Sequence, residues 1–358
     1  MRLRHLMQLT LFVIVAMALA ACAKPNDPQT RLKTAQAALE KGDTATAIRE
    51  LESITNADPK QVEARVLLGR AYEKANRTDD AINQYQAALT LQSQDPQVGF
   101  RLGALLVMAG KPVDAVAPLA AGVKLNAGMA MSYTREISAA VTAGMAASNA
   151  LVSNNPQQAA QLLDAITTLD AGNVRAHVLL GNLYVSGGQS QPAIEQYKAA
   201  LALDPKNISA ITNMGAAYYQ MGKLDDAIAQ FQLALQQAPD DAETHYLLGA
   251  AYIQQNKVQE AVSEFQAAIK SNPNLAAAYI GLGNAQMLQN DLDGAVASLN
   301  KATQLAPNQP EALYALGKVL MAKDDKAGAR QAFQRFLELN PPASRRAEVD
   351  EWLKQLGP

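Results

Sequence analysis

The chain has 358 residues, of which 49% are hydrophobic and only 5% aromatic, a composition that favours helices over sheets. Its 31 Lys and Arg nearly balance its 33 Asp and Glu, which excludes the strongly positive balance typical of a nucleic-acid-binding protein. Cys22 is the only cysteine, so an intrachain disulfide and a cysteine metal cage are excluded as well.

The first 21 residues predict a secretory signal peptide. Arg2 and Arg4 precede a mostly apolar stretch, Leu6 to Ala21, which falls short of the roughly 20 apolar residues that a transmembrane helix needs. Leu19-Ala20-Ala21-Cys22 resembles the bacterial lipobox, and this resemblance implies cleavage before Cys22 and its modification by acyl chains such as palmitate. An ordinary signal peptide with a chance cysteine is the alternative.

Residues 22–30 are predicted to form the lipidated cysteine and a short tether. Ala23 stands where an Asp would retain an enterobacterial lipoprotein in the inner membrane. The resemblance therefore implies an anchor in the outer membrane, with the rest of the chain facing the periplasm. Several acyl chains on one cysteine give stable anchoring, because a single chain binds membranes only marginally.

A period of 34 residues runs through the C-terminal half. Its columns are Gly181, Gly215, Gly249, Gly283 and Gly317, then Tyr197, Phe231, Phe265, Leu299 and Phe333, and then Pro205, Pro239, Pro273, Pro307 and Pro341. The glycines predict close approach of two helices, and the prolines predict a helix end. Gly222 and Asn256 fall where a first helix would end, a position that favours positive φ.

These columns resemble the tetratricopeptide repeat (TPR), a helix–turn–helix unit of 34 residues. The resemblance implies an all-α, right-handed superhelix of about nine repeats closed by a C-terminal capping helix. We predict repeats 1–3 in residues 31–126, an irregular insert with a degenerate fourth repeat in 127–173, repeats 5–9 in 174–341, and the capping helix in 342–358. The irregular stretch is a candidate hinge.

The sequence contains no recognisable catalytic or metal-binding motif. His177 and His245 occupy the same position of two repeats, where a packing residue is expected. The pair Asp225 and Asp226 falls in the first turn of a helix, where acidic side chains favour the helix dipole. We therefore expect no enzyme activity, no cofactor and no metal.

TPR proteins bind partners in the concave groove formed by the first helix of each repeat. Carried over by repeat position, the resemblance implies a candidate groove at Arg70, Arg175, Asn182, Asn213, Tyr219, Gln220, Glu243, Tyr246, Gln254, Asn284, Met287, Tyr314 and Lys318. Some TPR cochaperones clamp a C-terminal carboxylate with asparagines and basic residues. Asn182 and Asn213 match that clamp, but Glu243 stands where a basic residue should be, so a clamp of this kind is not expected.

The resemblance implies a membrane-anchored periplasmic scaffold that binds other proteins or peptide segments of the cell envelope. Such lipoproteins serve polysaccharide export, pilus assembly or outer-membrane assembly. An adaptor or regulator of a cell-wall enzyme is an open alternative. An accessory part of a glycosyltransferase is a weaker one, since no repeat supplies a nucleotide-sugar site.

Overall fold

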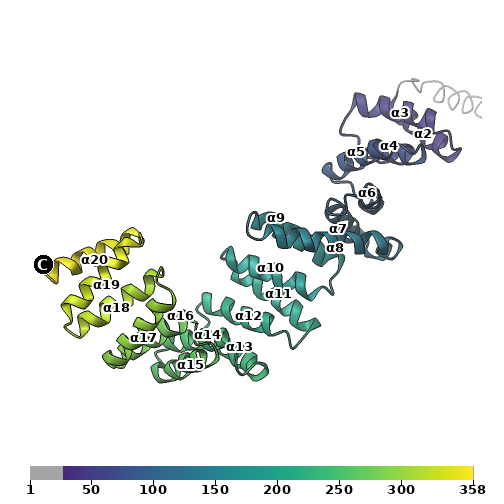
Figure 1. Ribbon diagram of the computed structural model, residues 1–358. Helices are drawn as coiled ribbons and strands as arrows, with labels where there is room; N and C mark the ends of the chain where they lie inside the picture. Colours follow the sequence, from purple (N-terminus) through teal and green to yellow (C-terminus); the bar gives the residue numbers. More distant parts are fainter. Residues whose placement is uncertain (1–26, 358) are drawn as a thin grey trace, which may run out of the picture. The chain divides into compact units, whose positions relative to one another are not determined.

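The computed structural model describes residues 27–357, which form nineteen α-helices, one 3-10 helix and no strand (Figure 1). The helices make nine consecutive pairs followed by one final helix, which confirms the predicted all-α repeat fold. None of these helices is both long enough and apolar enough to cross a membrane. The predicted signal peptide and the lipidated Cys22 lie outside the described residues.

The chain divides into two compact units after Ala176. Unit 1 contains four helix pairs and the 3-10 helix. Its elements are α2 (Pro28–Glu40), α3 (Thr44–Ala57), α4 (Val62–Lys74), α5 (Thr78–Thr90), α6 (Pro96–Met108), α7 (Val116–Leu125), η1 (Ala127–Tyr133), α8 (Thr134–Leu151) and α9 (Pro156–Leu169). The first described helix, α2, begins at Pro28 because the Asp27 carboxylate accepts a hydrogen bond from the Thr30 N–H, an N-cap within the segment predicted as tether.

Unit 2 contains five helix pairs and the final helix. Its elements are α10 (Val174–Ser186), in which the division falls, α11 (Ser190–Leu203), α12 (Ile208–Gln220), α13 (Leu224–Gln237), α14 (Ala242–Gln254), α15 (Val258–Ser271), α16 (Ala276–Leu288), α17 (Leu292–Leu305), α18 (Pro310–Ala322), α19 (Lys326–Glu338) and α20 (Ala343–Gln355). From α11 onwards, each helix up to α19 packs against the next one along the chain.

Eight of the nine pairs turn at a residue in the left-handed backbone region, and the α8–α9 pair is the exception. Gly222 has φ 71° after α12, and Asn256 has φ 59° after α14. Glycine adopts this conformation without steric cost and asparagine tolerates it, so the two residues serve the same turn. The second helix of the α12–α13 pair then starts with Asp225 and Asp226 in its first turn, as predicted.

The glycine column and the aromatic column face each other inside a repeat. A Cβ atom on Gly317 would lie 2.3 Å from the Phe333 ring, and one on Gly181 would lie 2.5 Å from the Tyr197 ring. Both rings are almost completely buried. The two helices of a pair therefore approach closely enough to bury a large ring only because the facing residue has no side chain.

The fourth repeat packs differently from the others. Apart from its own partner α6, the second helix of the third pair, α7, packs more extensively against α9 than against α8, and η1 contacts both α6 and α7. Gly144 permits this arrangement, because a Cβ there would lie 3.0 Å from both Ile166 and Val116. The predicted hinge in this stretch stays a prediction.

The final helix covers the end of unit 2. Val349 is fully buried, and Trp352 packs against Phe333 at 5.3 Å between ring centroids. Repeat arrays need a terminal element with one apolar and one polar face, since the last repeat has no further neighbour to cover it. On its other side α20 presents charged residues such as Glu351 and Lys354.

Candidate functional site

Two adjoining cavities lie along the first helices of three consecutive repeats in unit 2. One has a volume of about 280 Å³ and the other about 370 Å³. Ile280, Asn284 and Glu311 line both cavities, so the two form one continuous surface on α14, α16 and α18, with Tyr219 of α12 and Arg345 of α20 at its ends. We call this surface the unit 2 groove.

The groove exists because the same repeat position recurs on successive helices. Tyr246, Ile280 and Tyr314 are each the fifth residue of α14, α16 and α18, respectively. All three side chains are half-buried and line the groove. A 34-residue spacing therefore turns one residue position into a row of apolar side chains.

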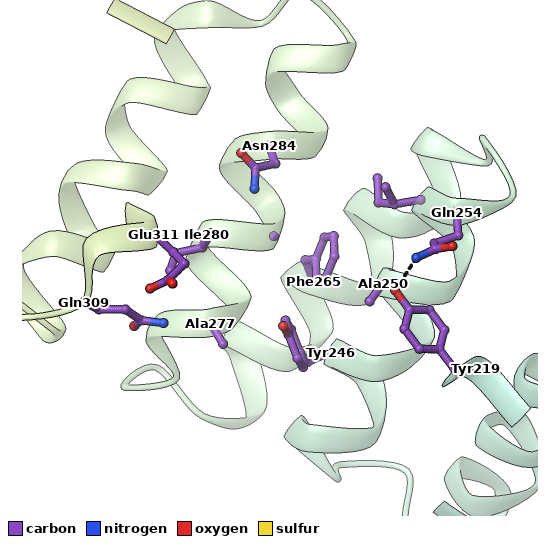
Figure 2. A pocket seen from close by; sticks show the side chains of 12 residues that line it. Tyr219, Tyr246, Ala250, Gln254, Phe265, Ala277, Ile280, Asn284, Gln309 and Glu311 are labelled. Atoms are coloured by element: carbon purple, nitrogen blue, oxygen red, sulfur yellow. Dashed lines mark hydrogen bonds between the residues drawn. The ribbon is translucent and has the colours of Figure 1, made fainter. Parts of the chain in front are cut away.

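Figure 2 shows the smaller cavity, with Tyr219 and Tyr246 beside each other on one side and Ile280 on the other. The Gln254 amide donates a hydrogen bond to the Tyr219 hydroxyl, with 2.8 Å between Nε2 and Oη. Glu311 and Gln309 approach the cavity from the next repeat. The walls are thus apolar and aromatic, with a few polar groups at the margin.

The structure brings seven of the predicted groove residues together here. Tyr219, Tyr246, Gln254, Asn284, Met287, Tyr314 and Lys318 line one or both cavities. Sequence reasoning missed Leu288, which is 58% exposed, and Arg345 of α20. Leu288 is the thirteenth residue of its helix, as Gln254 is of α14, and this shared repeat position could have predicted it. Arg345 could have been predicted only if α20 had been treated as the first helix of a further repeat.

Other predicted residues lie elsewhere in unit 2. The Asn182 side-chain oxygen accepts hydrogen bonds from the Tyr197 hydroxyl and from the Asn213 amide, each at 2.8 Å. Gln220 accepts a hydrogen bond from the Ser190 hydroxyl at 3.1 Å. These three predicted residues connect neighbouring repeats and line neither cavity of the groove.

The two remaining predicted residues are Arg175, close to the end of unit 1, and Glu243 in unit 2, and both are exposed and line neither cavity. Glu243 lies close enough to Tyr246 to affect its ionisation. Burial raises the pKa of the Tyr246 hydroxyl above its ordinary value, and the Glu243 carboxylate adds to that rise. Tyr246 is therefore neutral at physiological pH, and its ring packs near that of Phe265.

Arg70 lies in unit 1, in a polar setting. Its guanidinium forms an ion pair with Asp95 at 2.7 Å and donates a hydrogen bond to Gln97 at 3.0 Å. It lines a separate cavity of about 580 Å³ on α2 and α4, together with Lys74 and Glu40. This surface is charged, in contrast to the apolar unit 2 groove.

The histidines hold local structure. The Nδ1 atom of His177 lies 2.8 Å from Gln196 Oε1, and Nδ1 of His245 lies 2.6 Å from Glu264 Oε2. Each bond joins the fourth residue of a first helix to the second helix of the same pair. Among residues 27–357 no cluster of His, Cys, Asp and Glu has the arrangement of a metal site. The site with the clearest chemistry is therefore a surface suited to binding a polypeptide segment.

Comparison with known proteins identifies the repeats of the chain. Models described as the tetratricopeptide repeat match residues 32–96, 72–130, 212–276, 246–310 and 280–344, and a model described as the TPR repeat matches residues 181–222. No curated protein matches the chain.

Several solved structures resemble the chain. PilF of Pseudomonas aeruginosa is 19% identical over 61% of this chain and 99% of its own, with a TM-score of 0.53. The APC/C hetero-tetramer Cut9–Hcn1 is 15% identical over 93% of this chain and 90% of its own, with a TM-score of 0.51. MamA is 27% identical over 47% of this chain and 97% of its own, with a TM-score of 0.42. The first two similarities show a shared fold.

Proposed function

The chain belongs to the tetratricopeptide repeat family, whose members mediate protein–protein interactions, and on that premise we propose that it is a lipid-anchored periplasmic scaffold. It binds segments of cell-envelope proteins in the unit 2 groove, while the lipid on Cys22 anchors the chain in the outer membrane. Polysaccharide export, pilus assembly and outer-membrane assembly are the processes that such a scaffold would serve. The TPR fold is generally non-catalytic, in keeping with a binding role.

The unit 2 groove is the observation that carries the binding half of this proposal. Its walls combine aromatic and aliphatic side chains, such as Tyr246, Ile280 and Met287, with polar groups at the margin, such as Asn284 and Gln254. Aromatic residues and methionine are enriched in the cores of protein interfaces, and polar residues form their rims. A segment inserted between the repeats would bury this apolar surface.

The N-terminal sequence supports the anchoring half. The lipobox resemblance at Leu19 to Cys22 places the only cysteine of the chain where lipidation needs it. The helical body starts at Pro28, so few residues separate the acylated cysteine from the first repeat. An anchored chain would therefore hold its first repeats close to the membrane surface.

Replacing Cys22 with serine should release the protein from membranes, because the hydroxyl cannot take the place of the thiol that is acylated. The measurement is fractionation of cells that produce the full chain, with the protein detected in membrane and soluble fractions. The matched control is Ala23→Asp, which keeps Cys22 and should stay membrane-bound while moving towards the inner membrane. A Cys22→Ser protein that remains in the membrane fraction would contradict the lipid anchor.

An adaptor that regulates a cell-wall enzyme would use the same groove and the same anchor. The two roles differ in the partner recovered. Co-purification with components of an export or assembly machine supports the scaffold, whereas recovery of a single murein enzyme would replace it with the regulatory role.

A further inference from the structure

In the third repeat, the aromatic side chain at one first-helix position, Phe100, is covered by another aromatic side chain, Tyr133. Phe100 is the fifth residue of α6, the position that Tyr246 and Tyr314 hold in unit 2. The ring of Tyr133, the last residue of η1, lies 4.7 Å from the Phe100 ring at an interplanar angle of 15°, and Phe100 is fully buried. An irregular segment of the chain thus occupies this position with a stacked ring.

A second internal example occurs in unit 2. Tyr314, the fifth residue of α18, lies 5.7 Å from the Trp352 ring of α20. Arg345 lies over the Tyr314 ring, with its guanidinium carbon 4.9 Å from the ring centroid, and Glu348 accepts a hydrogen bond from the tyrosine hydroxyl at 2.8 Å. A helix of the chain therefore covers this ring with an aromatic and a basic residue.

Tyr246 holds the same helix position and faces the smaller cavity. Its one ring–ring contact among the described residues is with Phe265 of its own repeat, at 6.0 Å and 43°. The cavity beside it measures about 280 Å³, just below the roughly 300–1,000 Å³ of small-molecule sites. A space of this size has room for an inserted aromatic side chain.

The charge around this cavity favours a basic neighbour for the inserted side chain. Glu311 is the only charged residue among those that line the cavity. Glu243, on the same helix as Tyr246, adds a second carboxylate nearby. The α20 example shows the matching arrangement, in which Arg345 accompanies Trp352 at Tyr314.

We propose that the cavity beside Tyr246 takes an aromatic side chain of the partner segment, which stacks on the Tyr246 ring while a basic residue of the segment faces Glu311. This inference rests on the proposed function and narrows it to partner segments that carry an aromatic and a basic residue on one face. The contacts of Tyr133 with Phe100 and of Trp352 with Tyr314 are the models for the aromatic contact. The Glu311 carboxylate at the margin of the cavity is the reason to expect a basic residue in the partner segment.

The probe is a labelled synthetic peptide with the sequence of residues 343–357, the segment that presents Arg345 and Trp352 to Tyr314. In the full chain Tyr314 is already covered by α20, so the added peptide can occupy the cavity beside Tyr246. We expect the peptide to bind by fluorescence anisotropy, and we expect peptide versions with Trp352→Leu or Arg345→Glu to bind at least tenfold more weakly. In the chain, Tyr246→Leu should abolish the preference for tryptophan over leucine.

Tyr279→Leu is the matched control, since Tyr279 is a neighbouring half-buried tyrosine that does not line the cavity. Circular dichroism melting establishes that both variants fold. If the tryptophan and leucine peptides bind equally well and the Asn284→Arg variant binds neither, the aromatic preference is overturned and groove binding is supported. A tryptophan preference that survives in Tyr246→Leu would also overturn the inference, and binding of none of the peptides would contradict both the inference and groove binding.

Discussion

Removal of α20 is expected to destabilise the last repeat of unit 2 by on the order of 5 kcal/mol, because its apolar face covers the end of the array. Val349 is fully buried, and Trp352 packs on both Phe333 and Tyr314. Without α20 these rings face water. The measurement is hydrogen exchange of the α18 and α19 amides in a chain that ends at Pro342, where we expect protection to fall sharply.

Trp352→Ala tests the same contact without truncation and should cost about 3 kcal/mol, at the low end of the range for large aromatic residues because the side chain is only half-buried. Gln355→Ala is its control, since Gln355 is exposed on the same helix. Unchanged exchange of α19 in the truncated chain would show that α20 does not stabilise the repeat beneath it.

Gly99→Val is expected to cost about 3 kcal/mol or more, because α6 and α7 meet at this residue. A Cβ on Gly99 would lie 2.4 Å from the Pro118 carbonyl oxygen and 2.6 Å from the Gly122 nitrogen. Both are backbone atoms, so the contact is relieved only if the two helices move apart. Urea unfolding followed by circular dichroism measures the loss.

Gly172→Ala is the control for this change in the same unit, since its nearest atom would lie 3.5 Å away, an ordinary contact. We expect its unfolding midpoint to stay close to that of the unmodified chain. A Gly99→Val chain with an unchanged midpoint would contradict the close approach of α6 and α7.

The repeat fold could be predicted from the sequence because each column has a steric cause. Gly317 and Phe333 lie in two columns of the 34-residue period, and in the structure the ring fills the space that a side chain at the glycine would need. Gly222 and Asn256 differ chemically but share a positive φ. Such requirements recur in most repeats, so they leave a periodic trace in the sequence.

The groove was harder to predict, because repeat position does not fix what a polar side chain contacts. Asn182 and Asn284 are both the ninth residue of their helices. Asn284 lines the groove, whereas Asn182 bonds to Tyr197 and Asn213. The difference depends on which side chains happen to surround each position, and these vary between repeats.

The stacking of Tyr133 on Phe100 left no trace in the sequence at all. Tyr133 belongs to a 3-10 segment outside the repeat pattern, so no column predicts its place. Its position depends on how α8 and α9 pack against α7, an arrangement that occurs once in the chain. Features that interrupt a repeat pattern carry no periodic signal, so they can be recognised only in the structure.

The central claim is that the unit 2 groove holds protein partners, and site-specific photo-crosslinking in intact cells tests it most directly. A benzoylphenylalanine in place of Asn284 lies in the groove, while the same residue in place of Leu233 lies on an exposed face of α13. We predict discrete adducts with envelope proteins from position 284 and none from position 233. Adducts that form equally from both positions, or from position 233 alone, would contradict the claim that partners bind in the groove.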